Sequence, residues 1–242
     1  MKHGNLYLIP TVLGSIQPSE VLPSRVFRVI NKLKYFITED IRTARRFFKK
    51  AGLSVPVDEI IFFELNKFTK KEELAGFLQP AARGFDTGLL SEAGVPCIAD
   101  PGSEIVAIAH KSGIRVVPLT GPSSILLALM ASGLNGQKFC FNGYLPVKAR
   151  ERNNMIKKLE QESAKKGQAQ IFMETPYRNM QMINSLTTTC KPSTMLCIAC
   201  DITLDTEFIM TLTVGEWRQK KPDIHKRPAI FIIQSQSTMQ NI

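Results

Sequence analysis

Short runs of apolar and β-branched residues alternate with longer, polar segments along the first half of the chain. The runs predict strands at 6–10, 35–38, 60–65, 86–90 and 114–119, and the segments between the first of them are rich in Lys, Arg and Ala, as helices are. A regular alternation of strands and helices predicts a mostly parallel sheet with helices on both faces.

Two helices near the middle of the chain have clear sequence boundaries. Residues 103–113 predict a helix with an apolar stripe along one face. We expect Ser103 to cap the N-terminus of this helix and Gly113 to end it. Residues 125–132 predict a short apolar helix, which Gly133 ends by accepting a left-handed backbone conformation.

The second half of the chain predicts a mixed α/β unit. A charged helix at 148–166 precedes a strand at 170–174, a helix that starts at Thr175 and Pro176, and strands at 195–200, 207–214 and 229–233. Gly, Asn and Pro are concentrated at 136–146, so we place a domain boundary near Leu145. The prediction is therefore an N-terminal α/β domain at 1–145 and a C-terminal α/β domain with a mixed sheet at 146–242.

Composition narrows the class of protein. Of 242 residues 44% are hydrophobic, yet the longest apolar stretch, 125–131, is far shorter than the ~20 residues that span a bilayer, so we expect a cytoplasmic protein with no membrane partner. The five cysteines indicate free thiols. Cys197 and Cys200 point to opposite faces of a predicted strand and the three histidines are isolated, so no metal site is predicted.

The formal net charge of +10 favours an anionic partner, such as RNA or an acidic metabolite, over a neutral one. Four cations on the segment after the second strand share one helical face, at the spacing i, i+3, i+4 and i+7: Arg42, Arg45, Arg46 and Lys49. This face could neutralise phosphates, or it could be a solvated basic surface.

Two loops, 91–102 and 120–124, leave the carboxyl ends of predicted strands and lead into helices, which is where open α/β sheets bind ligands. Gly94 and Gly121 permit close approach of backbone, and Ser123 and Ser124 offer hydroxyls to a polar ligand. Such loops suit a nucleoside cofactor, although they could also be simple tight turns, because no dinucleotide or P-loop glycine motif is present.

Several blocks of sequence resemble the tetrapyrrole methylase superfamily, in order along nearly the whole chain. The most specific blocks are Leu-Ser-Glu-Ala-Gly-Val-Pro-Cys-Ile-Ala-Asp-Pro-Gly-Ser at 90–103 and Val-Pro-Leu-Thr-Gly-Pro-Ser-Ser at 117–124. Further matches lie at 38–42, 131–134, 141–146, 172–178 and 199–207. Within the superfamily the chain is most similar to the branch of ribosomal-RNA cytidine 2′-O-methyltransferases.

The resemblance implies two α/β domains with an S-adenosylmethionine site in the cleft between them, and a homodimer. The residues that it implies for cofactor binding are Leu13, Gly14, Ala93, Gly94, Val95, Ile98, Ser123, Ser124, Met173 and Ile202. Apolar walls and backbone groups of this kind suit a buried adenine.

Methyl transfer from a sulfonium needs alignment and exclusion of water more than a strong base. We name Glu39, Arg42 and Glu174 as candidate catalytic residues. A carboxylate at a strand end, such as that of Glu39 or Glu174, could take a proton or hold the ribose. Arg42 is one of the cations that could neutralise phosphates. Glu39 and Asp40 could instead only favour a helix N-terminus, and Arg178 could either pair with Glu174 or contact a phosphate.

The resemblance, the basic charge and the candidate residues leave three hypotheses for the function. The leading hypothesis is 2′-O-methylation of a cytidine ribose in small-subunit ribosomal RNA, with the RNA or the small ribosomal subunit as partner. The second is methylation of a tetrapyrrole or another small anionic acceptor. The third is a cofactor-binding scaffold without turnover, because residues 11–15 lack the proline and asparagine that the RNA branch usually has there.

Overall fold

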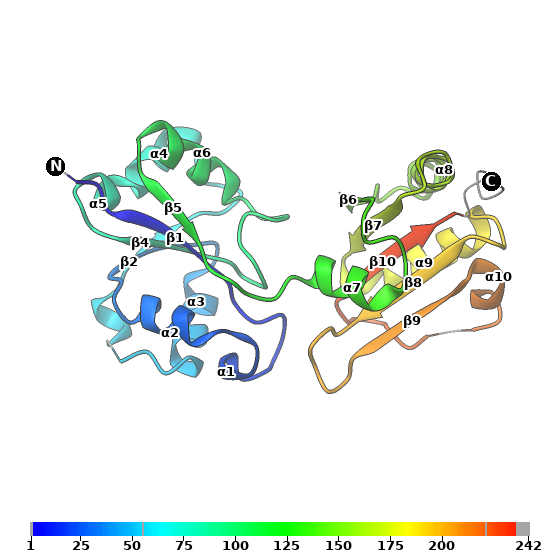
Figure 1. The fold of residues 1–242 in the computed structure, drawn as a ribbon, viewed down its shortest axis with the longest axis horizontal. Coiled ribbons are helices and arrows are strands. Elements are labelled where there is room, and N and C mark those ends of the chain that lie inside the picture. The colour runs from blue at the N-terminus through cyan, green and yellow to red at the C-terminus, as the bar shows by residue number, and fades with distance from the viewer. Residues whose placement is uncertain (1, 55, 221, 236–242) are drawn as a thin grey trace. The chain divides into compact units, whose positions relative to one another are not determined.

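The computed structural model of the chain, which describes residues 2–54, 56–220 and 222–235, is built of two α/β units (Figure 1). The first unit ends at Ser123 and the second begins at Ser124. Each unit contains one five-stranded sheet. The predicted fold class, with a parallel first sheet and a mixed second sheet, is confirmed.

The sheet of the first unit is entirely parallel and has the order β3-β2-β4-β1-β5. Its strands are β1 (Asn5–Ile9), β2 (Tyr35–Thr38), β3 (Ile61–Glu64), β4 (Thr87–Leu90) and β5 (Arg115–Pro118). Because all strands run in one direction, their carboxyl ends and the loops that follow them lie along a single edge.

Helices cover both faces of this sheet. They are α1 (Pro18–Val21), α2 (Ser24–Ile30), α3 (Ile41–Lys50), η1 (Val57–Glu59), α4 (Lys71–Phe77), α5 (Gln79–Ala82) and α6 (Ser103–Lys111). Buried residues of α2 and α3 form one apolar cluster with Ile9, Phe36 and Leu90, whereas α4 and α6 pack with Leu6 and Ile37. The alternation of these strand residues between faces explains why the strands read as nearly continuous apolar runs.

The sheet of the second unit has the order β6-β7-β10-β8-β9, with β6 and β7 parallel and the other neighbours antiparallel. Its strands are β6 (Phe139–Tyr144), β7 (Ala169–Glu174), β8 (Met195–Cys200), β9 (Phe208–Thr213) and β10 (Ala229–Gln234). β10 is central and fully apolar over 229–233, as expected for a strand covered on both sides.

The helices of the second unit are α7 (Ser124–Ser132), α8 (Ala149–Lys166), η2 (Pro176–Arg178), α9 (Asn179–Thr189) and α10 (Val214–Trp217). The core under α8 and α9 contains Phe172, Phe231 and Trp217, and the Trp217 indole donates a hydrogen bond to the Leu196 carbonyl at 2.8 Å. None of the helices in the described ranges is long and apolar enough to cross a membrane.

Several details differ from expectation. Gly102, rather than Ser103, is the N-cap of α6, because Ser103 already has helical backbone and makes no capping hydrogen bond. Strand β6 was not predicted, since its Asn142 and Gly143 resemble a turn; they form an irregular ladder with β7 instead. Residue 145, the predicted boundary, lies beyond α7 and β6, which the structure groups with the second unit because they pack on its sheet.

Candidate functional site

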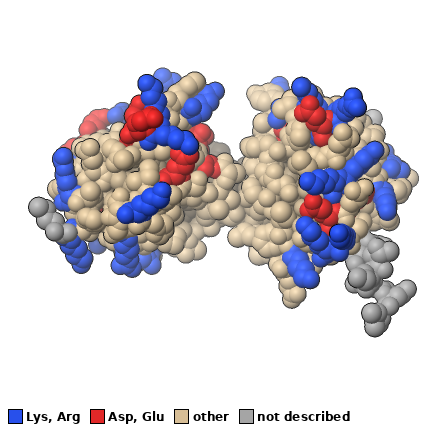
Figure 2. All heavy atoms as spheres, turned by 90° about the horizontal axis from the view of Figure 1, so that it is seen from above, with Lys and Arg blue, Asp and Glu red and all other residues tan. Residues whose placement is uncertain are grey.

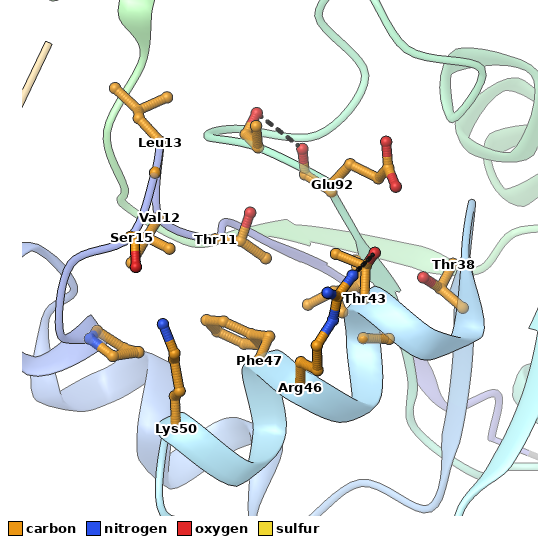
Figure 3. A pocket seen from close by; sticks show the side chains of 16 residues that line it. Thr11, Val12, Leu13, Ser15, Thr38, Thr43, Arg46, Phe47, Lys50 and Glu92 are labelled. Atoms are coloured by element: carbon orange, nitrogen blue, oxygen red, sulfur yellow. Dashed lines mark hydrogen bonds between the residues drawn. The ribbon is translucent and has the colours of Figure 1, made fainter. Parts of the chain in front are cut away.

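A pocket of about 360 Å³ opens at the carboxyl edge of the first sheet (Figure 3). The loop after β1, the ends of β2 and β4, and one side of α3 form its wall. The lining residues are Thr11, Val12, Leu13, Gly14, Ser15, Pro18, Thr38, Thr43, Ala44, Arg46, Phe47, Lys50, Leu90, Ser91, Glu92 and Ala93. Its size lies within the range of ~300–1,000 Å³ that is usual for ligand pockets.

The topology explains why the pocket forms here. The chain leaves β1 toward α2 on one face of the sheet, whereas it leaves the adjacent strand β4 toward α6 on the other face. Loops that diverge in this way leave a crevice between them, which is where open α/β sheets bind ligands.

Three loops pack tightly at this edge. The Thr11 amide donates to the Gly94 carbonyl at 2.9 Å, which joins the loop after β1 to the loop after β4. Gly94 has a φ of +73°, and a Cβ on it would lie 2.9 Å from both Leu13 Cδ2 and the Pro122 carbonyl oxygen. Glycine at this position is therefore required by conformation and by contact. The structure thus brings together the predicted residues Leu13 and Gly94.

The loop from Ser91 to Gly102 is strained and is held by one half-buried carboxylate. Cys97 and Ala99 both have positive φ, at 67° and 61°. Asp100 Oδ1 accepts hydrogen bonds from the amides of Cys97 at 2.8 Å and Gly102 at 2.9 Å. Burial raises the pKa of Asp100 while these hydrogen bonds oppose the rise. Strain that is maintained by specific hydrogen bonds is typical of ligand-binding loops.

The same carboxylate affects the neighbouring thiol. Burial, and secondarily the charge of Asp100, raise the pKa of Cys97 to about 11. Cys97 is therefore a neutral thiol that fills space rather than a nucleophile.

Glu39 and Asp40, between β2 and α3, are adjacent carboxylates with opposite behaviour. Asp40 is the N-cap of α3 and accepts from the Thr43 amide at 2.6 Å, and this hydrogen bond lowers its pKa. Burial and the charges of Glu92, Asp100 and Asp40 raise the pKa of Glu39. A carboxylate with a raised pKa is the better proton acceptor, so the geometry separates a capping residue from a candidate base.

The cations of α3 do not act as one stripe. Arg45 lies 3.7 Å from Asp58, while Arg42 and Lys49 are exposed and do not line the pocket. Arg46 lines the pocket, and so does Lys50, one helical turn further on, which sequence reasoning did not single out. For the pocket itself, the candidates for phosphate binding are therefore Arg46 and Lys50.

The corresponding edge of the second unit holds the predicted residue Met173. Glu174 at the end of β7 and Cys200 at the end of β8 both pair with Ala229, so these two strand ends flank the start of β10. Met173, one residue before Glu174, is half-buried and pairs with Ile230.

Glu174 is held by its own loop. Its side chain is fully buried, and Oε1 accepts from the Thr175 amide at 2.6 Å and from Arg178 at 2.5 Å and 2.9 Å. This geometry settles the alternative for Arg178 in favour of an ion pair. Oε2 of Glu174 has no hydrogen-bond partner among the described residues.

Ile202, the other residue predicted from this unit, lies in a strained turn after β8. Its neighbours Asp201 and Thr203 have φ values of 50° and 74°. Asp201 Oδ2 accepts from Arg227 at 2.8 Å, and this hydrogen bond raises the pKa of Arg227. The Thr203 hydroxyl is buried and, within the described ranges, has no partner.

The remaining predicted cofactor residues are placed as follows. Leu13, Gly14 and Ala93 line the pocket, and Val95 and exposed Ile98 follow Gly94 in the loop held by Asp100. Ser123 is the last residue of the first unit, and Ser124 is the first of α7.

Sequence reasoning missed Thr11, Lys50, Asp100 and Thr203. Asp100 could have been found from its place before Pro101 and Gly102 in a loop that needs a hydrogen-bond acceptor. Thr11 and Thr203 carry no such signal, because an unpartnered hydroxyl is a property of packing. In the part of the chain that the structure describes, no group of three or more His, Cys, Asp and Glu side chains could hold a metal ion.

Each unit, taken by itself, has groups that fit S-adenosylmethionine, the cofactor that the resemblance implies. In the second unit two buried oxygens have no partner among the described residues: Glu174 Oε2, on the residue that follows Met173 in the sequence, and Thr203 Oγ1, on the residue that follows Ile202. In the first unit there is no room for a Cβ at Gly94, so the backbone of this residue packs directly against the Leu13 side chain. Acceptors and apolar groups of this kind match the ammonium, hydroxyl and adenine groups of a nucleoside cofactor.

Comparison with known proteins defines the class. Residues 18–217 match the family of Tetrapyrrole (Corrin/Porphyrin) Methylases. The chain therefore belongs to the tetrapyrrole methylase family and is an S-adenosylmethionine-dependent methyltransferase, which confirms the predicted family, activity and cofactor.

One relative and two solved structures illustrate the similarity. Over 240 residues, 98% of this chain and 80% of the relative, the sequence is 27% identical to ribosomal RNA small subunit methyltransferase I of Escherichia coli O157:H7. The methyltransferase CobJ superposes with a TM-score of 0.64 at 15% identity, over 96% of this chain and 94% of that one. Uroporphyrin-III C-methyl transferase from Thermus thermophilus, solved with S-adenyl homocysteine, gives 0.56 at 16% identity, over 96% and 98%. At these identities the two structures establish the fold.

Proposed function

We propose that this methyltransferase acts on small-subunit ribosomal RNA and methylates the 2′-oxygen of a cytidine ribose. The observation that supports this acceptor most strongly is the similarity over 98% of the chain to a relative named for the small ribosomal subunit RNA. The formal net charge of +10 agrees with a polyanionic acceptor. On the face that Figure 2 shows, Lys and Arg occur on both units.

Glu39 is the residue that we assign to the proton of the ribose hydroxyl. It directly follows the pocket residue Thr38, and the neighbouring carboxylates that raise its pKa include the pocket residue Glu92. A base of raised pKa can accept the proton as the oxygen is alkylated, so no free hydroxide is needed. Bound S-adenosylmethionine supplies the electrophilic methyl group and a neutral thioether leaving group.

The other residues position the reactants. Gly94 and Asp100 hold the loop after β4, and Glu174 with Arg178 holds the turn after β7. Rigid loops of this kind reduce the entropy lost when an acceptor oxygen is aligned for in-line displacement. Arg42 is exposed and outside the pocket wall, so we assign it to outer contacts with the RNA backbone.

The test is methyl transfer from radiolabelled S-adenosylmethionine to small ribosomal subunits purified from a strain that lacks this gene. Nuclease digestion then locates the label. We expect label on a ribose 2′-oxygen of a cytidine, in a dinucleotide that resists alkaline hydrolysis. Label on a base, or transfer only to a tetrapyrrole acid offered in parallel, would contradict the proposed acceptor.

We further propose that the protein acts as a homodimer in the cytoplasm, where ribosomal subunits are assembled. Both statements rest on the family resemblance and on the proposed acceptor. Sedimentation equilibrium over a range of concentrations tests the first, because a monomer at every concentration would contradict it. Localisation of the tagged protein at native expression tests the second.

A further inference from the structure

Two cations of α3 reach the pocket without an acidic partner. Arg46 donates through Nη2 to Thr43 Oγ1 at 3.1 Å, and Lys50 lies one turn further along the helix (Figure 3). Among the residues that the structure describes, neither forms an ion pair, in contrast to Arg45, which is 3.7 Å from Asp58. Two uncompensated cations on one wall of a pocket favour an anionic ligand.

A buried hydroxyl belongs to the lining of the same pocket, on the loop after β1. Thr11 is 3% exposed, and its Oγ1 has no hydrogen-bond partner in the described part of the chain. Its backbone amide is bound to the Gly94 carbonyl, so the loop cannot readily turn this residue to the solvent. Buried hydroxyls are nearly always satisfied, and one that faces a pocket indicates a polar ligand atom.

The charges of the pocket also limit the class of ligand that it can bind. Glu92 lines it, and the charge of Glu92 contributes to the raised pKa of Glu39 nearby. Acidic groups beside the two cations disfavour a ligand with many carboxylates, whereas they tolerate one that carries a single negative charge and several neutral oxygens. A ribose with its phosphodiester has this distribution of charge.

We propose that the α3 side of this pocket holds one nucleotide unit of the acceptor RNA strand, with a phosphate between Arg46 and Lys50 and a ribose oxygen at the Thr11 hydroxyl. The predicted cofactor residues in the same lining, Leu13, Gly14 and Ala93, are left to S-adenosylmethionine. The inference rests on the proposed function and adds to it the residues that bind the strand. Arg46 and Lys50 are positioning residues in this scheme, because they hold the backbone and do not touch the reacting atoms.

The first experiment compares Lys50→Gln with Lys49→Gln, which removes an equal charge from an adjacent, exposed residue outside the pocket. Methyl transfer and binding are measured with small ribosomal subunits as the probe. We expect Lys50→Gln to raise KM about tenfold with little change in kcat, as the loss of one charged hydrogen bond implies. The slope of log affinity against log salt should fall by about one, with no change for Lys49→Gln.

The second experiment uses Thr11→Val, which keeps the side-chain shape and removes the hydroxyl. We expect the midpoint of thermal unfolding to stay the same or rise, because an unpartnered buried hydroxyl is replaced by a methyl group. Binding of the subunits should nevertheless weaken several-fold. A purely structural role for Thr11 would instead lower the unfolding midpoint together with the affinity.

The outcomes separate this inference from the proposed function. If the wild-type protein methylates the subunits but Lys50→Gln and Lys49→Gln have the same KM and the same salt slope, the inference is wrong and the function stands. If the wild-type protein labels no ribosomal RNA, the proposed function fails, and the inference fails with it.

Discussion

The carboxyl edges of the two sheets differ in how their charges are balanced. In the second unit Glu174 is paired with Arg178, and Asp201 with Arg227. In the first unit the charged groups at the edge, which include Arg46, Lys50, Glu39 and Glu92, form no ion pair within the described residues. Paired charges hold turns in place, whereas unpaired ones remain available to a ligand. This difference supports the proposal that the first edge contacts the acceptor, while the paired charges of the second edge hold its loops.

The largest expected effect tests this contrast directly. Glu174→Ala leaves Arg178, which is 25% exposed, without its buried partner, and should lower the free energy of unfolding by about 2–3 kcal/mol. The measurement is equilibrium unfolding in urea. Removing a carboxylate from the first edge, in Glu39→Gln, serves as the matched variant and should not destabilise the protein. Equal destabilisation by both substitutions would remove the distinction between the edges.

An intermediate effect is expected in the loop after β4. Gly94→Ala introduces a Cβ at positive φ that also meets Leu13 and Pro122, so it should cost about 2 kcal/mol and weaken cofactor binding. Gly113→Ala is the control, because Gly113 has nearly the same φ, +68°, but nothing lies within 4 Å of its Cβ position. This control should cost only about 1 kcal/mol and leave cofactor affinity, measured by calorimetry, unchanged. Similar losses in both variants would show that packing of the three loops is unimportant.

The smallest effects concern Glu39 and Asp40. The folded state raises the pKa of Glu39 above its ordinary value of 4.5, so the folded state holds its proton more tightly and stability falls as pH rises through this region. Glu39→Gln should therefore stabilise the protein at pH 7, by less than about 1 kcal/mol because the group is largely solvated, and should have no effect well below the ordinary pKa.

Asp40 should show the opposite sign. Its folded pKa is lowered from 3.8, so its contribution to stability is present above that value and is lost as pH falls through the folded pKa. Asp40→Ala should accordingly destabilise the protein at pH 7 and less so in strong acid. Thermal unfolding across pH measures both variants, and shifts of the same sign would contradict the division of roles between the two carboxylates.

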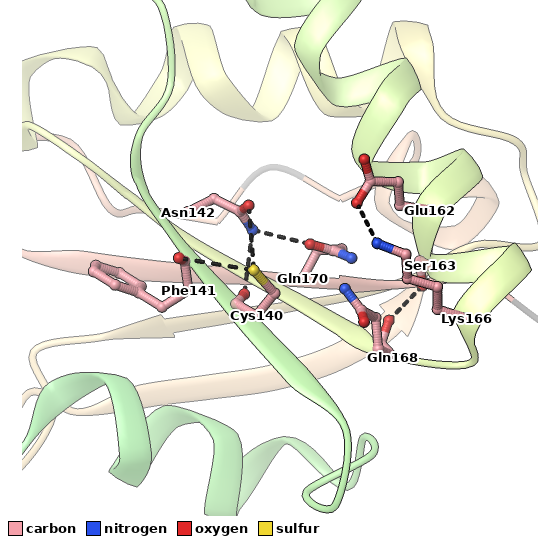
Figure 4. Close-up of polar contacts among 8 residues, drawn as sticks. All are labelled: Cys140, Phe141, Asn142, Glu162, Ser163, Lys166, Gln168 and Gln170. Carbon is pink, nitrogen blue, oxygen red and sulfur yellow. Dashed lines mark hydrogen bonds and ion pairs between the residues drawn. The ribbon is translucent and has the colours of Figure 1, made fainter.

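Much of the fold was predictable because the first sheet is parallel and buried. Its strands are continuous apolar runs, and glycines mark the loops that follow them. Strand β6 escaped prediction because it lies at the edge of a sheet, where Asn142 donates to Gln170 at 3.0 Å (Figure 4). Asn142 also donates to the Ile171 carbonyl at 3.3 Å. Asn and Gly in such a strand depend on neighbours that local propensity does not include.

The sequence also located part of the pocket lining, while the roles of these residues stay predictions. Loop motifs identified the edge on which Leu13, Gly14 and Ala93 line a pocket, and the family resemblance supplied the cofactor. Helical spacing grouped Arg42, Arg45, Arg46 and Lys49, but only Arg46 of these four lines the pocket. Spacing could not show this, because it does not include groups from other segments, such as Asp58, which pairs with Arg45.

The sequence by itself determined the α/β class, the position of the loops at the carboxyl edge of the first sheet, and the family, because alternating apolar segments and glycine-rich blocks are local properties of the chain. Only the tertiary structure decided that Lys50 rather than Lys49 reaches the pocket, that Glu174 is neutralised by Arg178, and that the Thr11 hydroxyl has no partner among the described residues. The physical reason is that the charge balance and hydrogen bonding of a side chain depend on every group packed around it, and most of those groups are remote in sequence.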